Sequence, residues 1–89
     1  MQRADAVIVN KLGLHARPSA KITQLASKFK SEVWMSKGAR RINAKSIMGV
    51  MMLAAAKGTT IGVEASGPDE AEAVAALVEL IANGFGEET

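Results

Sequence analysis

The sequence predicts an α+β open-faced β-sandwich, in which three helices cover one face of a four-stranded antiparallel sheet. Two observations carry this prediction: three segments repeat apolar residues at helical spacing, and four short segments between them have the pattern of strands. Their order is strand, helix, strand, strand, helix, strand, helix (βαββαβα), which places the helices on one side of the sheet. With 89 residues, we expect one domain spanning residues 1–89.

The amino-terminal third is expected to form one strand and one helix. The strand is placed at Asp5 to Asn10, around the apolar run Ala6-Val7-Ile8-Val9. The helix is placed at Ala16 to Phe29, because apolar residues recur there at i, i+3, i+4 and i+7 and form one stripe that faces a core. The members of this stripe are Ile22, Leu25, Ala26 and Phe29.

The middle of the chain is expected to form a hairpin and a short helix. Glu32–Ser36 and Arg40–Asn43 have the pattern of strands, and Lys37-Gly38 between them is a turn signal. Ser46 precedes the next apolar run, as an N-cap does, and Gly58 is expected to end that helix in the left-handed conformation. The predicted stripe of this short helix is Ile47, Val50, Met51 and Ala54.

The last third is expected to form a strand at Thr59–Ala65 and a helix that begins near Asp69. The helix is predicted to end at Asn83-Gly84, and the acidic tail from Gly86 to Thr89 is expected to fray. Its apolar residues repeat as in the first helix, so both helices are expected to pack on the same core. They are Val74, Leu77, Val78 and Ile81.

Composition excludes several classes of site. The chain has no cysteine and one histidine, which rules out a disulfide framework, a thiolate metal site and a histidine-rich metal site. We expect no signal peptide, because Arg3 and Asp5 interrupt the amino terminus and no apolar core follows. The longest apolar stretch, Ile47 to Ala56, is too short to span a bilayer, so no membrane insertion is expected.

Basic residues are concentrated in one half of the chain. Residues 11 to 45 carry nine lysines and arginines, and Glu32 is their single acidic residue. Such a distribution indicates an acidic protein partner or nucleic acid. Three aromatic residues without a stacking ladder, and the lack of a basic recognition helix, argue against nucleic acid. One of these aromatics, Trp34, is expected to be a half-exposed packing residue of the hairpin.

The stretch from Leu12 to Ser19 holds the histidine, His15, where the first strand gives way to the first helix. The first turn of a helix carries unpaired N–H groups and partial positive charge, and it binds anions. Arg17 adds donors that match phosphate oxygens, and Pro18 suits a first helical turn. Because a neutral imidazole is a nucleophile, this group predicts a site that accepts a phosphoryl group. A helix cap or a packed ring is the alternative for His15.

The second landmark is the run from Asn43 to Gly49, which contains Ser46. Met48 and Met52 fall largely outside the predicted stripe of the short helix. Exposed methionines are adaptable contact residues on binding surfaces, whereas buried ones fill gaps in a core, and both interpretations stay open here. The first and second helices can present their starts on the same side, which would place His15 and Ser46 near one surface with the methionines between or beside them.

With both landmarks, the chain resembles the HPr family, the histidine-containing phosphocarriers of the bacterial phosphoenolpyruvate:sugar phosphotransferase system. The run Gly13-Leu14-His15-Ala16-Arg17-Pro18 corresponds to the active-site motif of the family. The run Lys45-Ser46-Ile47-Met48-Gly49 corresponds to its regulatory-serine motif. The resemblance covers nearly the whole chain, and the two motifs have the expected separation.

The resemblance implies that His15 accepts a phosphoryl group on Nδ1 from phosphorylated enzyme I and donates it to an enzyme II A domain in the cytoplasm. Arg17 and the first-turn amides, beginning with Ala16, would hold the phosphate. Ser46 would be the site of HPr kinase/phosphorylase in cells that have this enzyme. The implied docking face consists of Ala16, Arg17, Ala20, Ile47, Met48, Met51 and Met52.

The implied role is that of a carrier, not of a self-sufficient enzyme, since no general-base partner or metal set accompanies His15. We accordingly expect no cofactor and no metal, and a monomer, as suits a protein that docks transiently. Ser19 stands where many family members have a small apolar residue, and its role as a cap or an extra phosphate donor is open.

Two other functions compete with sugar transport. One is a paralogue of the nitrogen-linked branch, which uses the same histidine chemistry toward regulatory partners and is compatible with the Gly84-Phe85-Gly86 ending. The other is a purely regulatory module that acts through Ser46. Members of that type lack the active histidine, so the presence of His15 argues against it as the sole role.

Overall fold

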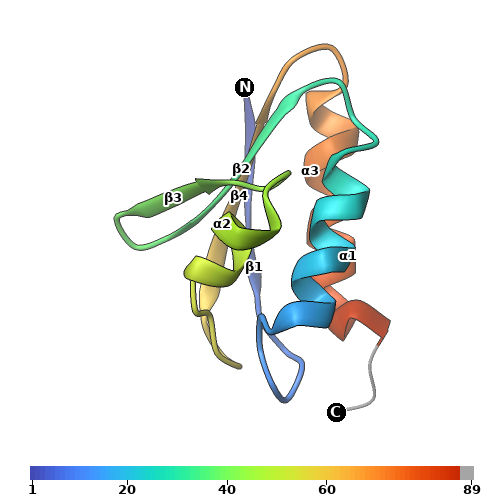
Figure 1. Cartoon of the computed structure of the whole chain (residues 1–89). Helices are drawn as coiled ribbons and strands as arrows, with labels where there is room; N and C mark the ends of the chain where they lie inside the picture. The colour runs from blue at the N-terminus through green and yellow to red at the C-terminus, as the bar shows by residue number, and fades with distance from the viewer. Residues whose placement is uncertain (87–89) are drawn as a thin grey trace.

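The computed structural model describes residues 1–86 and has the predicted order of strands and helices (Figure 1). The expected fraying of the tail concerns mainly residues 87–89, which lie outside the described range. No helix in residues 1–86 is long and apolar enough to cross a membrane. The elements are β1 (Gln2–Val7), α1 (Ala16–Ala26), β2 (Glu32–Lys37), β3 (Arg40–Asn43), α2 (Ile47–Met52), β4 (Thr60–Ser66), α3 (Glu70–Ala82) and the 3-10 turn η1 (Gly84–Gly86).

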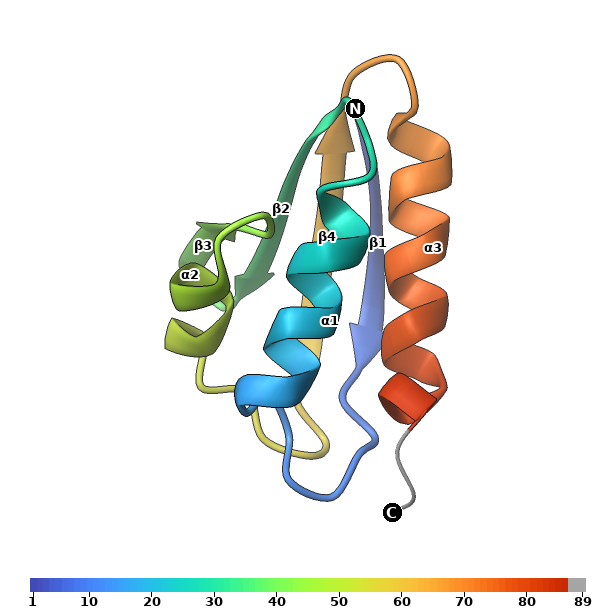
Figure 2. The same ribbon diagram turned by 45° about the vertical axis from the view of Figure 1, so that its right-hand side comes forward.

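The strands pair antiparallel in the order β1-β4-β2-β3. Helices α1, α2 and α3 lie on one side of this sheet and leave the other side open, as Figure 2 shows. On the covered face Ala6 lies opposite Ile61, and Met35 lies opposite Val63. All four side chains are buried, so the core lies between the sheet and the helices. The predicted α+β open-faced sandwich is confirmed.

Polar side chains pair across the strands on the open face of the sheet. Glu64 on β4 accepts a hydrogen bond from Arg3 on β1 (3.1 Å) and one from Arg41 on β3 (3.4 Å). The guanidinium of Arg41 also lies 4.1 Å from the centroid of the Trp34 ring. Trp34 is half-buried, which confirms its predicted packing role. Cross-strand contacts therefore stabilise the face that no helix covers.

The first strand begins and ends earlier than predicted. It spans Gln2–Val7 rather than Asp5 to Asn10, because β4 pairs with it from Gln2 to Val7. The apolar run that suggested the longer strand extends past the end of the pairing. Ile8 stays buried outside the strand, and its N–H donates to the carbonyl of Thr59 (2.9 Å).

Helix α1 ends at Ala26 rather than at Phe29. The N–H groups of Lys28 and Phe29 donate to carbonyls three residues earlier, which is the tighter spacing of a 3-10 turn. Phe29 still packs against the core although it lies outside the helix. The apolar stripe therefore predicted the correct face and overestimated the length.

The segment after α2 differs from the prediction at two positions. Leu53 is buried, whereas Ala54, which the apolar spacing places in the helix stripe, is exposed. Ala54 (φ 49°) rather than Gly58 has the left-handed conformation directly after the helix. Gly58 (φ 92°) lies in the turn before β4, where its N–H donates to the carbonyl of Ile8 (2.7 Å). The chain turns at Ala54 because Leu53 must reach the core.

The end of α3 agrees with the predicted stop at Asn83-Gly84, and the segment beyond it contains an unpredicted core residue. Phe85 is 1 % exposed and has a φ of 61°. Its carbonyl accepts a hydrogen bond from Lys21 Nζ on α1 (2.6 Å). This contact joins the end of the described chain to the helix that begins at His15.

The carboxylate of Asp69 ties the start of α3 to the loop between α1 and β2. It accepts hydrogen bonds from the N–H of Lys30 (2.9 Å), the N–H of Ser31 (2.9 Å) and the Ser31 hydroxyl. The Ser31 hydroxyl, followed by the Lys30 N–H, lowers the pKa of Asp69 from its ordinary value of 3.8 to about 2. Gly67 fits beside this contact because a Cβ there would lie 2.7 Å from Ser31 Cα.

We expect Asp69→Asn to lower the melting temperature at neutral pH, because an amide accepts these hydrogen bonds more weakly than a carboxylate does. The folded pKa is lower than the ordinary value, so the stabilisation exists above pH 3.8 and is lost as the pH falls through about 2. Thermal unfolding across this range should show the two proteins converging. Asp5→Asn, which removes an exposed partner 3.5 Å from Arg3, is the control, and an equal loss in both variants would refute the assignment.

Candidate functional site

The loop between β1 and α1 is held by hydrogen bonds within itself and to the segment after α2. Asn10 Nδ2 donates to the carbonyl of Gly13 (2.9 Å), and the N–H of Leu14 donates to the carbonyl of Ala55 (2.9 Å). Gly13 has a φ of 69°, and a Cβ on it would collide with the Ala55 carbonyl. The buried side chain of Leu14 anchors the same loop in the core. The position of His15 is therefore fixed by contacts of the residues that precede it, from both backbone and side chains.

His15 is the N-cap residue of α1, at the junction that the sequence predicted. Its backbone is extended, and its carbonyl accepts a hydrogen bond from the N–H of Ser19 (3.0 Å). The imidazole makes no capping hydrogen bond to the helix, so the alternative of a side-chain cap is wrong. The residue is half-buried, and its Nε2 atom is shielded from solvent.

The first turn of α1 offers two backbone donors beside the imidazole. Among residues 1–86, no acceptor pairs with the N–H groups of Ala16 and Arg17. Pro18 has no N–H, and the N–H of Ser19 is already bound to the carbonyl of His15. The two unpaired amides lie at the positive end of the helix, which favours an anion there.

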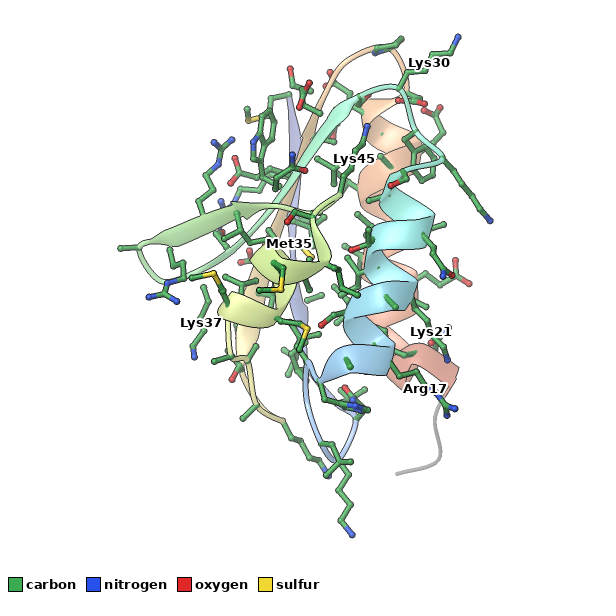
Figure 3. All side chains as sticks on the ribbon, viewed as in Figure 1. Arg17, Lys21, Lys30, Met35, Lys37 and Lys45 are labelled. Atoms are coloured by element: carbon green, nitrogen blue, oxygen red, sulfur yellow. The ribbon has the colours of Figure 1, made fainter. Side chains whose placement is uncertain are left out.

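Arg17 is exposed and extends from the first turn of α1 on the side toward η1 (Figure 3). It is therefore able to bring a guanidinium to an anion at the helix start. Ser19 has neither of the two roles that the sequence left open, a helix cap or an extra phosphate donor. It lies inside the helix with its hydroxyl buried, so it is neither a cap nor an exposed phosphate donor.

Ser46 caps α2 as predicted. Its Oγ accepts a hydrogen bond from the N–H of Gly49 (3.1 Å), and its carbonyl accepts one from the N–H of Val50 (3.0 Å). The side chain is exposed, so the hydroxyl is open to modification. Gly49 packs closely against β3, where a Cβ would lie 3.3 Å from the carbonyl of Asn43.

The expectation that α1 and α2 start on the same side is wrong. Lys45, just before α2, donates from Nζ to the carbonyl of Phe29 beyond the end of α1 (2.9 Å). The segment after α2 instead contacts the loop before α1, through Leu14 and Ala55. The two neighbouring helices therefore run in opposite directions, as Figure 1 shows. Ser46 therefore lies at the end of α2 that is farther from His15.

Four large apolar side chains of α2 are exposed, and we call them the α2 surface. Their exposed fractions are 67 % for Met48, 59 % for Met52, and 40 % each for Ile47 and Met51. Within α2 the buried residue is Val50, so the predicted stripe was too wide. Because these methionines do not fill the core, the binding interpretation is the one that the structure supports. On α1, Ala16 is exposed and Ala20 half-buried.

Comparison with known proteins identifies the family. Residues 2–83 match the family described as PTS HPr component phosphorylation site. The chain belongs to the HPr family. It is 62 % identical to phosphocarrier protein HPr of Cupriavidus necator over 87 residues, with 98 % of each chain covered. An HPr structure from Thermoanaerobacter tengcongensis covers 100 % of both chains at 49 % identity with a TM-score of 0.95. An HPr dimer from that organism has 49 % identity and a TM-score of 0.78, covering 98 % and 100 %.

The runs around His15 and Ser46 were singled out from the sequence, but the residues that hold these runs in place were not. Neither contact leaves a periodic signal: the Asn10 side chain binds the carbonyl of Gly13 within one loop, and the N–H of Leu14 binds the carbonyl of Ala55 in another loop. The one residue in the sequence that pointed to a close contact here was Gly13, directly before Leu14 and His15. Among residues 1–86, no three histidine, cysteine, aspartate or glutamate side chains are grouped as metal ligands. The expectation that the protein needs no metal stays a prediction.

Gly13→Ala should destabilise the protein by about 2 to 4 kcal/mol, because it adds a steric collision to an unfavourable positive φ. Gly38→Ala is a matched control, since Gly38 has a similar φ of 59° and nothing lies within 4 Å of where its Cβ would be. The control should lose about 1 kcal/mol from its backbone conformation alone. Urea unfolding of both variants measures the difference, and equal losses would show that the contact with Ala55 is unimportant.

Proposed function

We propose that the protein accepts a phosphoryl group on Nδ1 of His15 from phosphorylated enzyme I and donates it to enzyme II A domains for sugar uptake. The observation that carries this proposal is the half-buried imidazole at the start of α1, next to the unpaired N–H groups of Ala16 and Arg17. Membership in the HPr family of phosphocarriers supports it. The cytoplasm is the proposed location, and a monomer the proposed docking species.

The chemistry follows from the two ring nitrogens. Nε2 of His15 is shielded from solvent, which favours Nδ1 as the attacking atom. The lone pair of Nδ1 forms a bond to phosphorus while the bond between phosphorus and the donor group of enzyme I breaks, and the electron pair of that bond stays on the donor group. The amides of Ala16 and Arg17 and the guanidinium of Arg17 stabilise the phosphoryl oxygens. In the second transfer the bond between Nδ1 and phosphorus breaks while a nucleophile of the enzyme II A domain forms a bond to phosphorus, and the electron pair of the broken bond returns to Nδ1.

A carrier must hold the phosphoryl group without trapping it. One arginine and two amides at an exposed helix start provide fewer donors than a closed cationic pocket, so the group can leave again. His15 is the single histidine, and the residues beside it in α1 include no carboxylate to act as a general base. We therefore assign the remaining transition-state stabilisation to the partner enzymes, which makes this protein a carrier and not a complete catalyst.

The surface around His15 supports docking of an acidic partner. Between Asp5 and Glu64 the sequence contains a single acidic residue, Glu32. Arg17 and the α2 surface thus belong to a region that combines positive charge with exposed apolar area. Such a combination steers an acidic protein surface and then buries its apolar patch. We assign this role to Ala16, Arg17, Ala20, Ile47, Met48, Met51 and Met52.

Phosphorylation by enzyme I and phosphoenolpyruvate should add one acid-labile phosphate, and His15→Ala should abolish it. Arg17→Ala should lower the second-order transfer rate at least about tenfold, because it removes charged donors to the phosphate. Lys28→Ala, with the same change of charge on the same chain but beyond the end of α1, is the control. Intact mass before and after acid treatment reads the first result, and rapid-quench kinetics the second. Phosphate that persists in His15→Ala would disprove the assignment.

Ser46→Asp should slow transfer from enzyme I about three- to tenfold, because it places negative charge beside the α2 surface. The fold should stay intact, since aspartate also caps helices. Ser46→Asn is the matched variant, because asparagine caps equally well without charge. Equal transfer rates for the two variants would show that charge at this position does not regulate docking.

The nitrogen-linked branch is the alternative acceptor of the same chemistry. The Gly84-Phe85-Gly86 ending and the methionine-rich α2 are compatible with it. Comparing transfer rates from the sugar-branch and the nitrogen-branch enzyme I distinguishes the two roles. The faster donor identifies the branch.

A further inference from the structure

Helix α2 has little support of its own. It contains 6 residues, one of which, Val50, is buried. Helices shorter than about 12 residues are marginal in water, and most of their stability in proteins comes from a buried face. The side chains of the α2 surface add only part of that burial, since Ile47 and Met51 are each 40 % exposed and Met48 and Met52 are more than half exposed. Other contacts must therefore hold the helix in place.

Three cationic side chains form hydrogen bonds with backbone carbonyls near the two ends of α2: one extends from the residue before the helix, and two bind carbonyls at its end. At the start, Lys45 Nζ donates to the carbonyl of Phe29 (2.9 Å) and ties α2 to α1. At the end, Arg40 donates to the carbonyl of Met52 (2.7 Å), and Lys37 Nζ donates to that of Ala54 (3.3 Å). Figure 3 shows Lys45 and Lys37 at opposite ends of the helix.

Of the three cations, Arg40 is the one that binds a carbonyl of α2 itself. Met52 is the last residue of α2, and its carbonyl lacks a partner within the helix. This end of a helix carries partial negative charge, so a guanidinium there stabilises it. Arg40 comes from β3, where it lies opposite Lys37 of β2, so both cations have a rigid base in the sheet. Ala54 directly beyond has a left-handed φ of 49°, which is unfavourable for alanine and requires a neighbouring contact to hold it.

We propose that Arg40, assisted by Lys37, is a positioning residue that holds the α2 surface in its binding conformation. The proposal rests on the proposed function, in which this surface docks against enzyme I. A surface that is ordered before docking loses less conformational entropy on binding, and its affinity is higher. The arginine thus acts on docking through α2, without touching the phosphoryl group.

The experiment compares Arg40→Met with Arg41→Met. Both variants remove one positive charge from adjacent positions of β3, but Arg41 lies on the open face against Glu64 and Trp34. Arg40→Met should speed amide hydrogen exchange of residues 50 to 54 about two- to fivefold, because a helix end loses its cation. Arg41→Met should leave these amides unchanged. With enzyme I, Arg40→Met should raise KM by a similar factor without changing kcat, while Arg41→Met should show only the smaller effect of lost charge.

Arg40→Lys, which keeps the charge, should restore most of the exchange protection and of the KM. A raised KM with unchanged exchange in α2 would overturn the proposal, because Arg40 would then contact the partner directly. Unchanged KM with faster exchange would overturn it as well, since the order of α2 would not matter for docking. If wild-type protein receives no phosphate from enzyme I, the proposed function fails, whereas the exchange measurement still tests whether Arg40 orders α2.

Discussion

The close approach of two loops, Gly13 against Ala55, is the constraint on which the functional end of the molecule depends. One loop leads into α1 and the other leaves α2, so the backbone hydrogen bond from Leu14 to Ala55 joins the start of α1 to the end of α2. A side chain at Gly13 would push the loops apart. The start of α1 and the α2 surface are therefore connected through backbone, although they come from different parts of the sequence.

Because α1 and α2 run in opposite directions, the two ends of the α2 surface lie at different distances from His15. The end of α2 lies toward His15, and Ser46 lies at the far end, roughly 9 Å away along the helix axis for six residues at 1.5 Å each. A charge at Ser46 directly precedes Ile47 of the α2 surface, well within the Debye length of about 8 Å at physiological salt, and it does not block the imidazole itself. Regulation through Ser46 would thus act on association with a partner and leave the chemistry at His15 intact.

The sequence predicted the fold class and the two motifs because each leaves a local signal. Apolar spacing identified the three helices and the inner faces of α1 and α3, and the N-cap residues His15 and Ser46 stood at motif positions. The missed features arise from contacts between distant segments. The early end of α1, the burial of Leu53 and Phe85, and the direction of α2 relative to α1 are set by how loops pack, which periodicity does not encode. The exposed methionines are an intermediate case: the spacing left their exposure open, and the structure decided it.

A carrier must combine a rigid fold with an exposed reactive end, and this chain separates the two requirements. The carboxylate of Asp69 and the pairs around Glu64 stabilise the sheet and the start of α3, away from the start of α1. Helix α2 keeps only Val50 buried, and cationic side chains form hydrogen bonds near its ends. Apolar area on α2 that would stabilise the fold if buried is thus exposed. If α2 docks as proposed, this area has to stay exposed, and the hydrogen bond from Arg40 then supplies stability that burial would otherwise give.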